Sequence, residues 1–294
     1  MMRSTTVETG LRSATPSSPV WDKGADGWNK HATLIRSWLH DVTAAMLDAG
    51  GVAPGSRVLD IAAGAGDQTL DVARRVGPQG YVLATDISAR ILALAQDNLR
   101  AAGLQHVETR LADAQALGLA GSDFDAAVCR LGLMFCANPL DALSGARQAL
   151  KPGGRLAAVV FSQPQHNPCL TLMMATALQH AGVPAKQPFE PGTLLSLGKP
   201  GLLAQLLDDA GFVNIEVQPV SAPFRVPSSQ HYVDFVRASG SPVMAILASL
   251  PVQAQKDAWD DMVQRLNVFT TPTGWVGPNE LLLCAAAAPA VGSV

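Results

Sequence analysis

Short apolar runs alternate with longer helical segments through the first half of the chain. Five runs of strand length have apolar side chains on both faces, at 57–63, 81–86, 107–112, 125–130 and 155–161. Between them, apolar residues recur at helical spacing over 88–102 and 140–150, and an amphipathic helix is predicted over 33–49. Because parallel strands need helical crossovers, the alternation predicts a doubly wound α/β fold with a mostly parallel sheet.

Two stretches, about 163–198 and 221–277, interrupt this pattern. Both are longer than ordinary connections between elements, so we expect them to be insertions that cap the sheet. A helix near 200–210 and a strand at 212–220 separate the two stretches, and a last strand is predicted near 280–286.

The second insertion contains one predicted helix, through Trp259, Met262 and Leu266. Residues 1–20 are rich in Ser, Thr and Pro, which predicts a disordered tail. We therefore expect residues 21–294 to form a single domain.

Composition narrows the class of protein. Of the 294 residues, 48% are hydrophobic and 15% are charged, which is enough apolar material for a packed core. The net charge is −3 without a basic cluster, so nucleic acid is not an expected partner. Four cysteines lack the close pairing of a metal site, and no apolar run reaches the roughly 20 residues that span a bilayer. We expect a cytoplasmic protein with neither a bound metal nor a membrane partner.

The first predicted strand runs into the sequence DIAAGAGDQT, residues 60–69. Gly64 and Gly66 permit a sharp turn and a close approach of a ligand to the main chain. Twenty residues after Gly66, the second strand ends at Asp86, whose carboxylate can accept two hydrogen bonds from a ribose diol. The combination predicts a nucleoside site, although the two glycines alone fit an ordinary strand-to-helix turn equally well.

The residues that follow the glycines indicate which nucleoside is bound. A dinucleotide-binding loop would continue with Gly or Ala at position 69, where this chain has Thr69, and Asp67 would repel a phosphate. A carboxylate there tolerates a ligand that carries a sulfonium and an ammonium group, such as S-adenosylmethionine. No Gly-Lys-Ser/Thr follows either, which excludes a P-loop.

Five motifs in order resemble the class I S-adenosylmethionine-dependent methyltransferases. They are VLDIAAGAGDQT (58–69), ATDIS (84–88), LADAQAL (111–117), DFDAAVCRLGLMF (123–135) and LKPGGRL (150–156). The resemblance covers about 51–165 and is strongest to the ubiquinone/menaquinone-biosynthesis-like branch, which methylates small molecules. It implies a Rossmann-like, seven-stranded sheet whose last two strands form an antiparallel pair. Residues 21–32 resemble the segment that folds over the cofactor in that branch, so we expect a lid there.

The resemblance also implies a cofactor-binding set: Trp28, Asp60, Gly64, Gly66, Gln68, Asp86, Ile87, Asp113, Ala114 and Arg130. In this set the two glycines border the methionine part of S-adenosylmethionine, and Asp86 binds the ribose hydroxyls. Asp113 accepts from the adenine amino group beside the backbone of Ala114. Asp60 orients the loop, or is simply a structural carboxylate. Arg130 contacts ligand or substrate, or else forms a plain surface ion pair.

The residues at the end of the fourth strand narrow the class of methyl acceptor. Residues 129–132 read Cys-Arg-Leu-Gly, without the turn motifs of enzymes that methylate nucleobase amines or cytosine C5, and Cys129 is expected to be an inert core thiol. His31, His166 and His231 are the candidate catalytic bases, because they lie in segments expected to cover the site. Aromatic and sulfur-containing residues are candidates for an apolar acceptor pocket: Trp21, Trp28, Met134, Phe135 and Tyr232.

These observations predict methyl transfer from S-adenosylmethionine to an oxygen, nitrogen or carbon of a small, fairly apolar metabolite by in-line displacement. Two alternatives remain open at this point. One is a nicotinamide-dependent oxidoreductase, and the other is a catalytically silent cofactor-binding or scaffold protein. The oligomeric state is also open, with a homodimer as one option.

Overall fold

A seven-stranded sheet, in the order β3-β2-β1-β4-β5-β10-β6, forms the centre of the computed structural model. The structure describes residues 19–119, 121, 123–184, 187–239 and 242–290. The strands are β1 (Arg57–Ile61), β2 (Tyr81–Asp86), β3 (Val107–Leu111), β4 (Phe124–Arg130), β5 (Leu150–Phe161), β6 (Val213–Ser221) and β10 (Glu280–Ala287). Strands β1 to β5 pair in parallel, whereas β10 is antiparallel to both β5 and β6. The predicted α/β fold class is confirmed.

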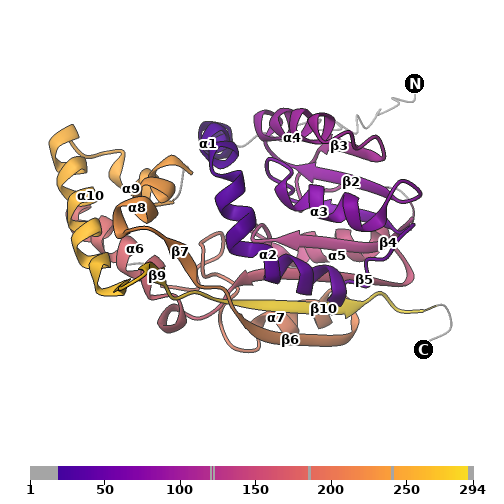
Figure 1. The fold of residues 1–294 in the computed structure, drawn as a ribbon. Helices are drawn as coiled ribbons and strands as arrows, with labels where there is room; N and C mark the ends of the chain where they lie inside the picture. The colour runs from indigo at the N-terminus through magenta and orange to yellow at the C-terminus, as the bar shows by residue number, and fades with distance from the viewer. Residues whose placement is uncertain (1–18, 120, 122, 185–186, 240–241, 291–294) are drawn as a thin grey trace, which may run out of the picture.

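Helices cover both faces of this sheet (Figure 1). On one face lie α2 (Ala32–Ala49), α3 (Asp67–Val76) and α4 (Ala89–Ala101), and on the other lie α5 (Pro139–Ala149) and α7 (Leu202–Asp209). The chain changes face between β3 and β4 because crossovers are right-handed and the strand order reverses there. The carboxyl ends of β1 and β4 consequently open a crevice at this switch point.

One edge strand, β3, differs from the sequence-based expectation. The run 107–112 was expected to be apolar on both faces, and this expectation is wrong: Glu108 and Arg110 of β3 are exposed. The strand order explains the difference, because β3 has a neighbour on one side only. The inner strands β1, β2 and β4 are buried along almost their whole length.

The two irregular stretches of the sequence pack together as one cap beside the sheet (Figure 1). The first contributes α6 (Pro168–Ala181). The second contributes β7 (Phe224–Val226), α8 (Ser229–Ala238), α9 (Pro242–Leu247), α10 (Val252–Leu266), β8 (Thr270–Thr271) and β9 (Gly274–Gly277). Helix α6 packs against α9 and α10, and the three short strands form a separate small sheet. The second insertion is therefore richer in structure than the single helix that was predicted.

Helix α1 (Pro19–Lys30) lies between the cap and the α4 side of the sheet (Figure 1). Asn98 of α4 donates a hydrogen bond to Asn29 at 2.9 Å, and Arg90 forms an ion pair with Asp26. On the cap side, a Cβ at Gly27 would lie 1.6 Å from the carbonyl oxygen of Ala238 in α8, so only glycine permits this packing. Of the predicted tail, residues 19–20 belong to α1, and residues 1–18 lie outside the described part.

None of the helices in the described part of the chain is both long and apolar enough to cross a membrane.

Candidate active site

The loop after β1 has left-handed backbone conformations at Ala62, Gly64 and Gly66. A Cβ at Gly64 would meet no heavy atom within 4 Å, because this residue faces the open space of a pocket. A Cβ at Gly66 would lie 3.2 Å from the Cβ of Ala95 in α4. Gly66 therefore allows α4 to pack closely. The resemblance implied that Gly66 borders the ligand, but Gly66 is not among the residues that line the pocket.

Asp60, at the end of β1, is fully buried beneath this loop. Its carboxylate accepts hydrogen bonds from the hydroxyl of Thr69, at 2.6 Å, and from the side-chain amide of Gln68. Burial raises the pKa of Asp60 to about 7, against the opposing effect of these two hydrogen bonds. Asp60 fixes the first turn of α3 and lies behind the pocket wall.

Asp86, at the end of β2, lines the pocket and is 8% exposed. Its Oδ2 atom accepts from the backbone N–H of Gly64 at 3.0 Å, and its Oδ1 atom accepts from the N–H of Ser88 at 2.9 Å. Burial raises the pKa of Asp86, whereas the backbone hydrogen bonds act in the opposite direction. The carboxylate is held in one orientation and keeps lone pairs free for a ligand.

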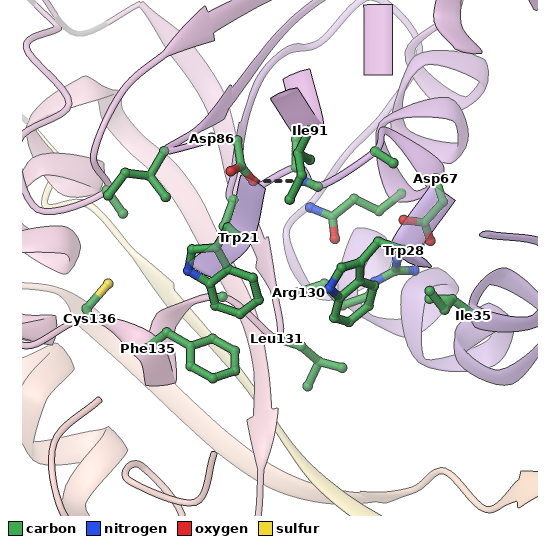
Figure 2. A pocket seen from close by; sticks show the side chains of 18 of the residues that line it. Trp21, Trp28, Ile35, Asp67, Asp86, Ile91, Arg130, Leu131, Phe135 and Cys136 are labelled. Carbon is green, nitrogen blue, oxygen red and sulfur yellow. Dashed lines mark hydrogen bonds and ion pairs between the residues drawn. The ribbon is translucent and has the colours of Figure 1, made fainter. Parts of the chain in front are cut away.

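Arg130 and Asp67 form a partly buried ion pair at another part of the same wall (Figure 2). The Arg130 side chain is 5% exposed and also donates to the hydroxyl of Thr43 at 2.6 Å. The ion pair considered as an alternative for Arg130 is thus present, but the Arg130 side chain in it is buried rather than at the surface. The sequence argument that the Asp67 carboxylate repels a phosphate did not include Arg130, whose positive charge offsets that of Asp67.

Asp113 and Ala114 lie beyond the end of β3 and line the same pocket as Gly64 and Asp86, which we call the first pocket. Asp113 accepts a hydrogen bond from the backbone N–H of Gln115 at 2.9 Å, which closes a tight turn. Nearby, burial raises the pKa of the Cys136 thiol to about 12, so this thiol stays protonated and unreactive. The expectation that Cys129 is a core thiol is confirmed by its burial in β4.

A second pocket adjoins the first, beneath the cap. Its apolar walls are formed mainly by α6, α8 and the segment 131–135 after β4, with further residues from α1 and α9. Five residues line both pockets: Trp21, Trp28, Trp38, Leu131 and Phe135. Aromatic rings continue into the cap, with centroids 4.8 Å apart for Trp38 and Phe224 and 5.1 Å apart for Phe224 and Phe235. None of the described residues that line this second pocket carries a charge.

Two buried polar atoms of the described residues have no hydrogen-bond partner, and both belong to residues that line the second pocket. They are the indole Nε1 of Trp28 and the side-chain Oδ1 of Asn279. Figure 2 shows the Trp28 indole on the wall of the first pocket, near Arg130. Since buried polar groups in folded proteins are nearly always paired, two free ones at a cavity indicate groups that a ligand would complete.

The structure brings most of the predicted residues together. All members of the predicted cofactor-binding set except Asp60 and Gly66 line the first pocket, and all five residues predicted for an acceptor pocket line the second.

The three candidate histidines are absent from the linings of both pockets. His31 contacts the ring of Phe235 edge-on, His166 pairs with Glu280, and His231 bonds to Ser228.

Sequence reasoning missed Thr43, Trp38, Phe224, Phe235 and Asn279. Trp38 was recognised only as part of an amphipathic helix, since core and pocket aromatic residues share the same spacing. Phe224, Phe235 and Asn279 come from the second insertion and its end, which the sequence motifs do not cover. Thr43 could have been found only indirectly, because an arginine at the end of a buried strand, Arg130, needs a hydrogen-bond partner.

Comparison with known proteins adds family information. The model of the ubiE/COQ5 methyltransferase family matches residues 20–179. The ubiquinone/menaquinone biosynthesis C-methyltransferase UbiE of Teredinibacter turnerae is 41% identical over 122 residues, which are 41% of this chain and 49% of that protein. The chain thus matches about half the length of this curated relative.

Solved structures show the same fold at low identity. Phosphoethanolamine N-methyltransferase 2 of Haemonchus contortus, in complex with S-adenosyl-L-methionine, superposes with a TM-score of 0.53 at 16% identity, covering 90% of this chain and 60% of that one. The [4+2]-cyclase SpnF superposes with a TM-score of 0.55 at 19% identity, covering 94% and 100%. Because one neighbour is a methyltransferase and another a cyclase, the shared fold alone does not decide the reaction.

Proposed function

The chain belongs to the ubiE/COQ5 methyltransferase family, and on this basis we propose that it transfers a methyl group from S-adenosylmethionine to a small, largely apolar metabolite. The observation that carries the proposal is the pair of adjoining pockets. The first is lined by carboxylates and a glycine loop, the second is apolar and uncharged, and three tryptophans line both. A charged cofactor and an apolar acceptor would meet at these shared residues.

The residues of the first pocket fit the nucleoside part of the cofactor. Asp86 keeps acceptor capacity for the two ribose hydroxyls, and the open space at Gly64 admits a ligand close to the main chain. Asp113 would accept from the adenine amino group, with Ala114 and Ile87 alongside. A nicotinamide-dependent alternative receives no support from the family match.

The opposite end of the first pocket fits the amino-acid part of the cofactor. The unpaired indole N–H of Trp28 can donate to its carboxylate, and the Asp67–Arg130 pair presents both signs of charge beside it. Gln68, fixed by Asp60, would complete this end.

Catalysis would rest on position and on exclusion of water. When bound, S-adenosylmethionine supplies an electrophilic methyl group that a nucleophilic atom of the acceptor attacks in line. Trp21, Trp28 and Phe135 would shield the reacting centre from solvent. Tyr232 is the only titratable group among the described residues that line the second pocket. Burial raises the pKa of Tyr232, which makes it unsuitable as a base near neutral pH.

We further propose that the enzyme works in the cytoplasm and takes part in the biosynthesis of small molecules. Its four cysteines are free and buried, as is common in proteins of reducing compartments. The match to curated enzymes of quinone biosynthesis supports the second point.

Ligand-dependent thermal stability tests the cofactor. S-adenosylhomocysteine at a hundredfold excess over its Kd should stabilise the protein by about 2.7 kcal/mol, which corresponds to a rise in Tm of several degrees. NAD and NADP at the same concentration serve as matched controls and should leave Tm unchanged. A larger rise with NAD would contradict the proposal, and binding of S-adenosylmethionine without turnover across an acceptor screen would favour a silent cofactor-binding protein.

A further inference from the structure

Asn279 presents an unused hydrogen-bond acceptor to the second pocket. The residue directly precedes β10, is 5% exposed and lines the pocket. Its Oδ1 atom is buried without a partner, and its Nδ2 atom has one long contact, 3.5 Å from the carbonyl oxygen of Gly277. Turning the amide over would bring Oδ1 against that carbonyl oxygen, so the observed orientation, with Oδ1 free, is the favourable one.

The neighbouring Asn167 shows what a purely structural asparagine does at this place. Its Nδ2 atom donates to the hydroxyl of Ser162 and to the carbonyl oxygens of Gln163 and Glu280, and its Oδ1 atom accepts from the N–H of Glu280. Asn167 is completely buried and uses both ends of its amide within the fold. The amide of Asn279 is almost as buried, yet half of it is left for a group from outside the chain.

We propose that Asn279 determines acceptor specificity by accepting a hydrogen bond from a hydroxyl or N–H group on an otherwise apolar, uncharged acceptor. This inference rests on the proposed function, because it takes the second pocket to be the acceptor pocket. The described lining residues include no charged side chain, so an acceptor with a carboxylate, phosphate or ammonium group would lose its hydration without compensation.

The chemistry of the free atom fixes the kind of group that is selected. An amide oxygen only accepts, so a donor such as a phenolic hydroxyl satisfies it, whereas an ether or methyl group at the same place leaves it unpaired. Selection of this kind arises because an acceptor without the donor leaves a polar atom of the protein buried and unpaired. Water would fill the position while the pocket is empty, and the donor of the acceptor would displace it.

Matched probes of the pocket test the inference. The two probes are 4-ethylphenol and 4-ethyltoluene, which have similar shapes and differ in one hydroxyl group. Their affinities for the protein saturated with S-adenosylhomocysteine are measured by quenching of the fluorescence of the tryptophans that line the pocket. Asn279→Leu should reduce the preference for the phenol over the toluene by about three- to tenfold, the equivalent of one hydrogen bond.

Thr176→Val is the matched control. Thr176 is buried in α6 and lines neither pocket, and its hydroxyl donates to the carbonyl oxygen of Leu172 at 2.8 Å, so the preference should stay at the wild-type value. An unchanged preference in Asn279→Leu, with S-adenosylhomocysteine still bound, would overturn the role of Asn279 and leave the proposed function intact. Failure of the wild-type protein to bind S-adenosylhomocysteine would instead overturn the proposed function.

A second measurement does not depend on the variant folding. In a crystal structure of the wild-type protein with S-adenosylhomocysteine and 4-ethylphenol, the phenolic oxygen should lie within about 3.0 Å of the Asn279 Oδ1 atom. A ring in the second pocket with its hydroxyl directed elsewhere would contradict the inference.

Discussion

Asp86 has a structural role in addition to the ligand-binding role that the sequence predicted. Its position at the end of β2 predicted a ligand for a ribose, and the structure adds that both carboxylate oxygens accept backbone N–H groups of the fold. Because the residue is almost fully buried, removing the carboxylate also leaves these N–H groups unpaired. A loss of ligand affinity must therefore be separated from a loss of stability.

Asp86→Ala should weaken the binding of S-adenosylhomocysteine by about 1.5–3 kcal/mol, the usual range for hydrogen bonds to a charged group. Titration calorimetry measures the affinity of each protein for S-adenosylhomocysteine. Asp125→Ala is the matched control, since Asp125 also accepts from a backbone N–H, that of Arg57, and pairs with Lys151 away from both pockets. Equal affinity in Asp86→Ala and Asp125→Ala would mean that the ribose is bound elsewhere.

Asp60 should make the free energy of unfolding depend on pH. Its pKa in the folded protein is about 7, above its value of about 3.9 in an unfolded chain. Between these values the folded state holds a proton that the unfolded state has lost, so the contribution of Asp60 to stability is present at low pH and is lost as the pH rises through 7. The slope from this one group reaches about 1.4 kcal/mol per pH unit.

Asp60→Asn lacks this titration. Urea unfolding of both proteins at pH 5, 6, 7 and 8 should show the free energy of unfolding of the wild type falling relative to the variant up to pH 7 and then levelling off. A difference that stays constant, or that grows with pH, would mean that Arg130 and the hydrogen bonds from Gln68 and Thr69 outweigh burial.

At the scale of elements, α1 connects the two halves of the molecule. Its polar residues pair with α4, and Gly27 packs directly on the end of α8. Trp21 and Trp28 project from the same helix into the wall shared by the two pockets. The segment predicted to act as a lid is thus a helix, and its movement would open both pockets together.

Hydrogen exchange tests this role. Peptides from residues 21–30 should exchange faster than those of α4 in the free protein and become protected with S-adenosylhomocysteine. In Gly27→Ala, the added Cβ conflicts with the carbonyl of Ala238, so this protection should be reduced. Gly145→Ala is the control, because Gly145 lies in α5 and its Cβ would meet only ordinary contacts. Equal protection of α1 with and without ligand would identify it as a static part of the fold.

At the scale of the whole molecule, the sheet was predictable and the cap was not. Apolar strands alternating with helices predicted a doubly wound, mostly parallel sheet, and the motifs at strand ends pointed to Asp86, Asp113 and Gly64, which line the first pocket. In the cap, α6 packs against α10, which follows it by about 70 residues, and no local pattern encodes such a pairing. For the same reason Asn279, which enters the second pocket through tertiary packing, has no signature in the sequence.

The part of the cap that lies between β6 and β10 leaves and rejoins the sheet at neighbouring points. Ala222, just after β6, donates its backbone N–H to the carbonyl oxygen of Asn279, just before β10, at 2.8 Å. The antiparallel pairing of the two strands thus already holds the ends of the segment together, and doubling its length would cost only about 0.6 kcal/mol of loop-closure free energy. Related chains can therefore differ in the length of residues 223–278 at little cost in loop-closure free energy, provided that Ala238 keeps its contact with Gly27 of α1.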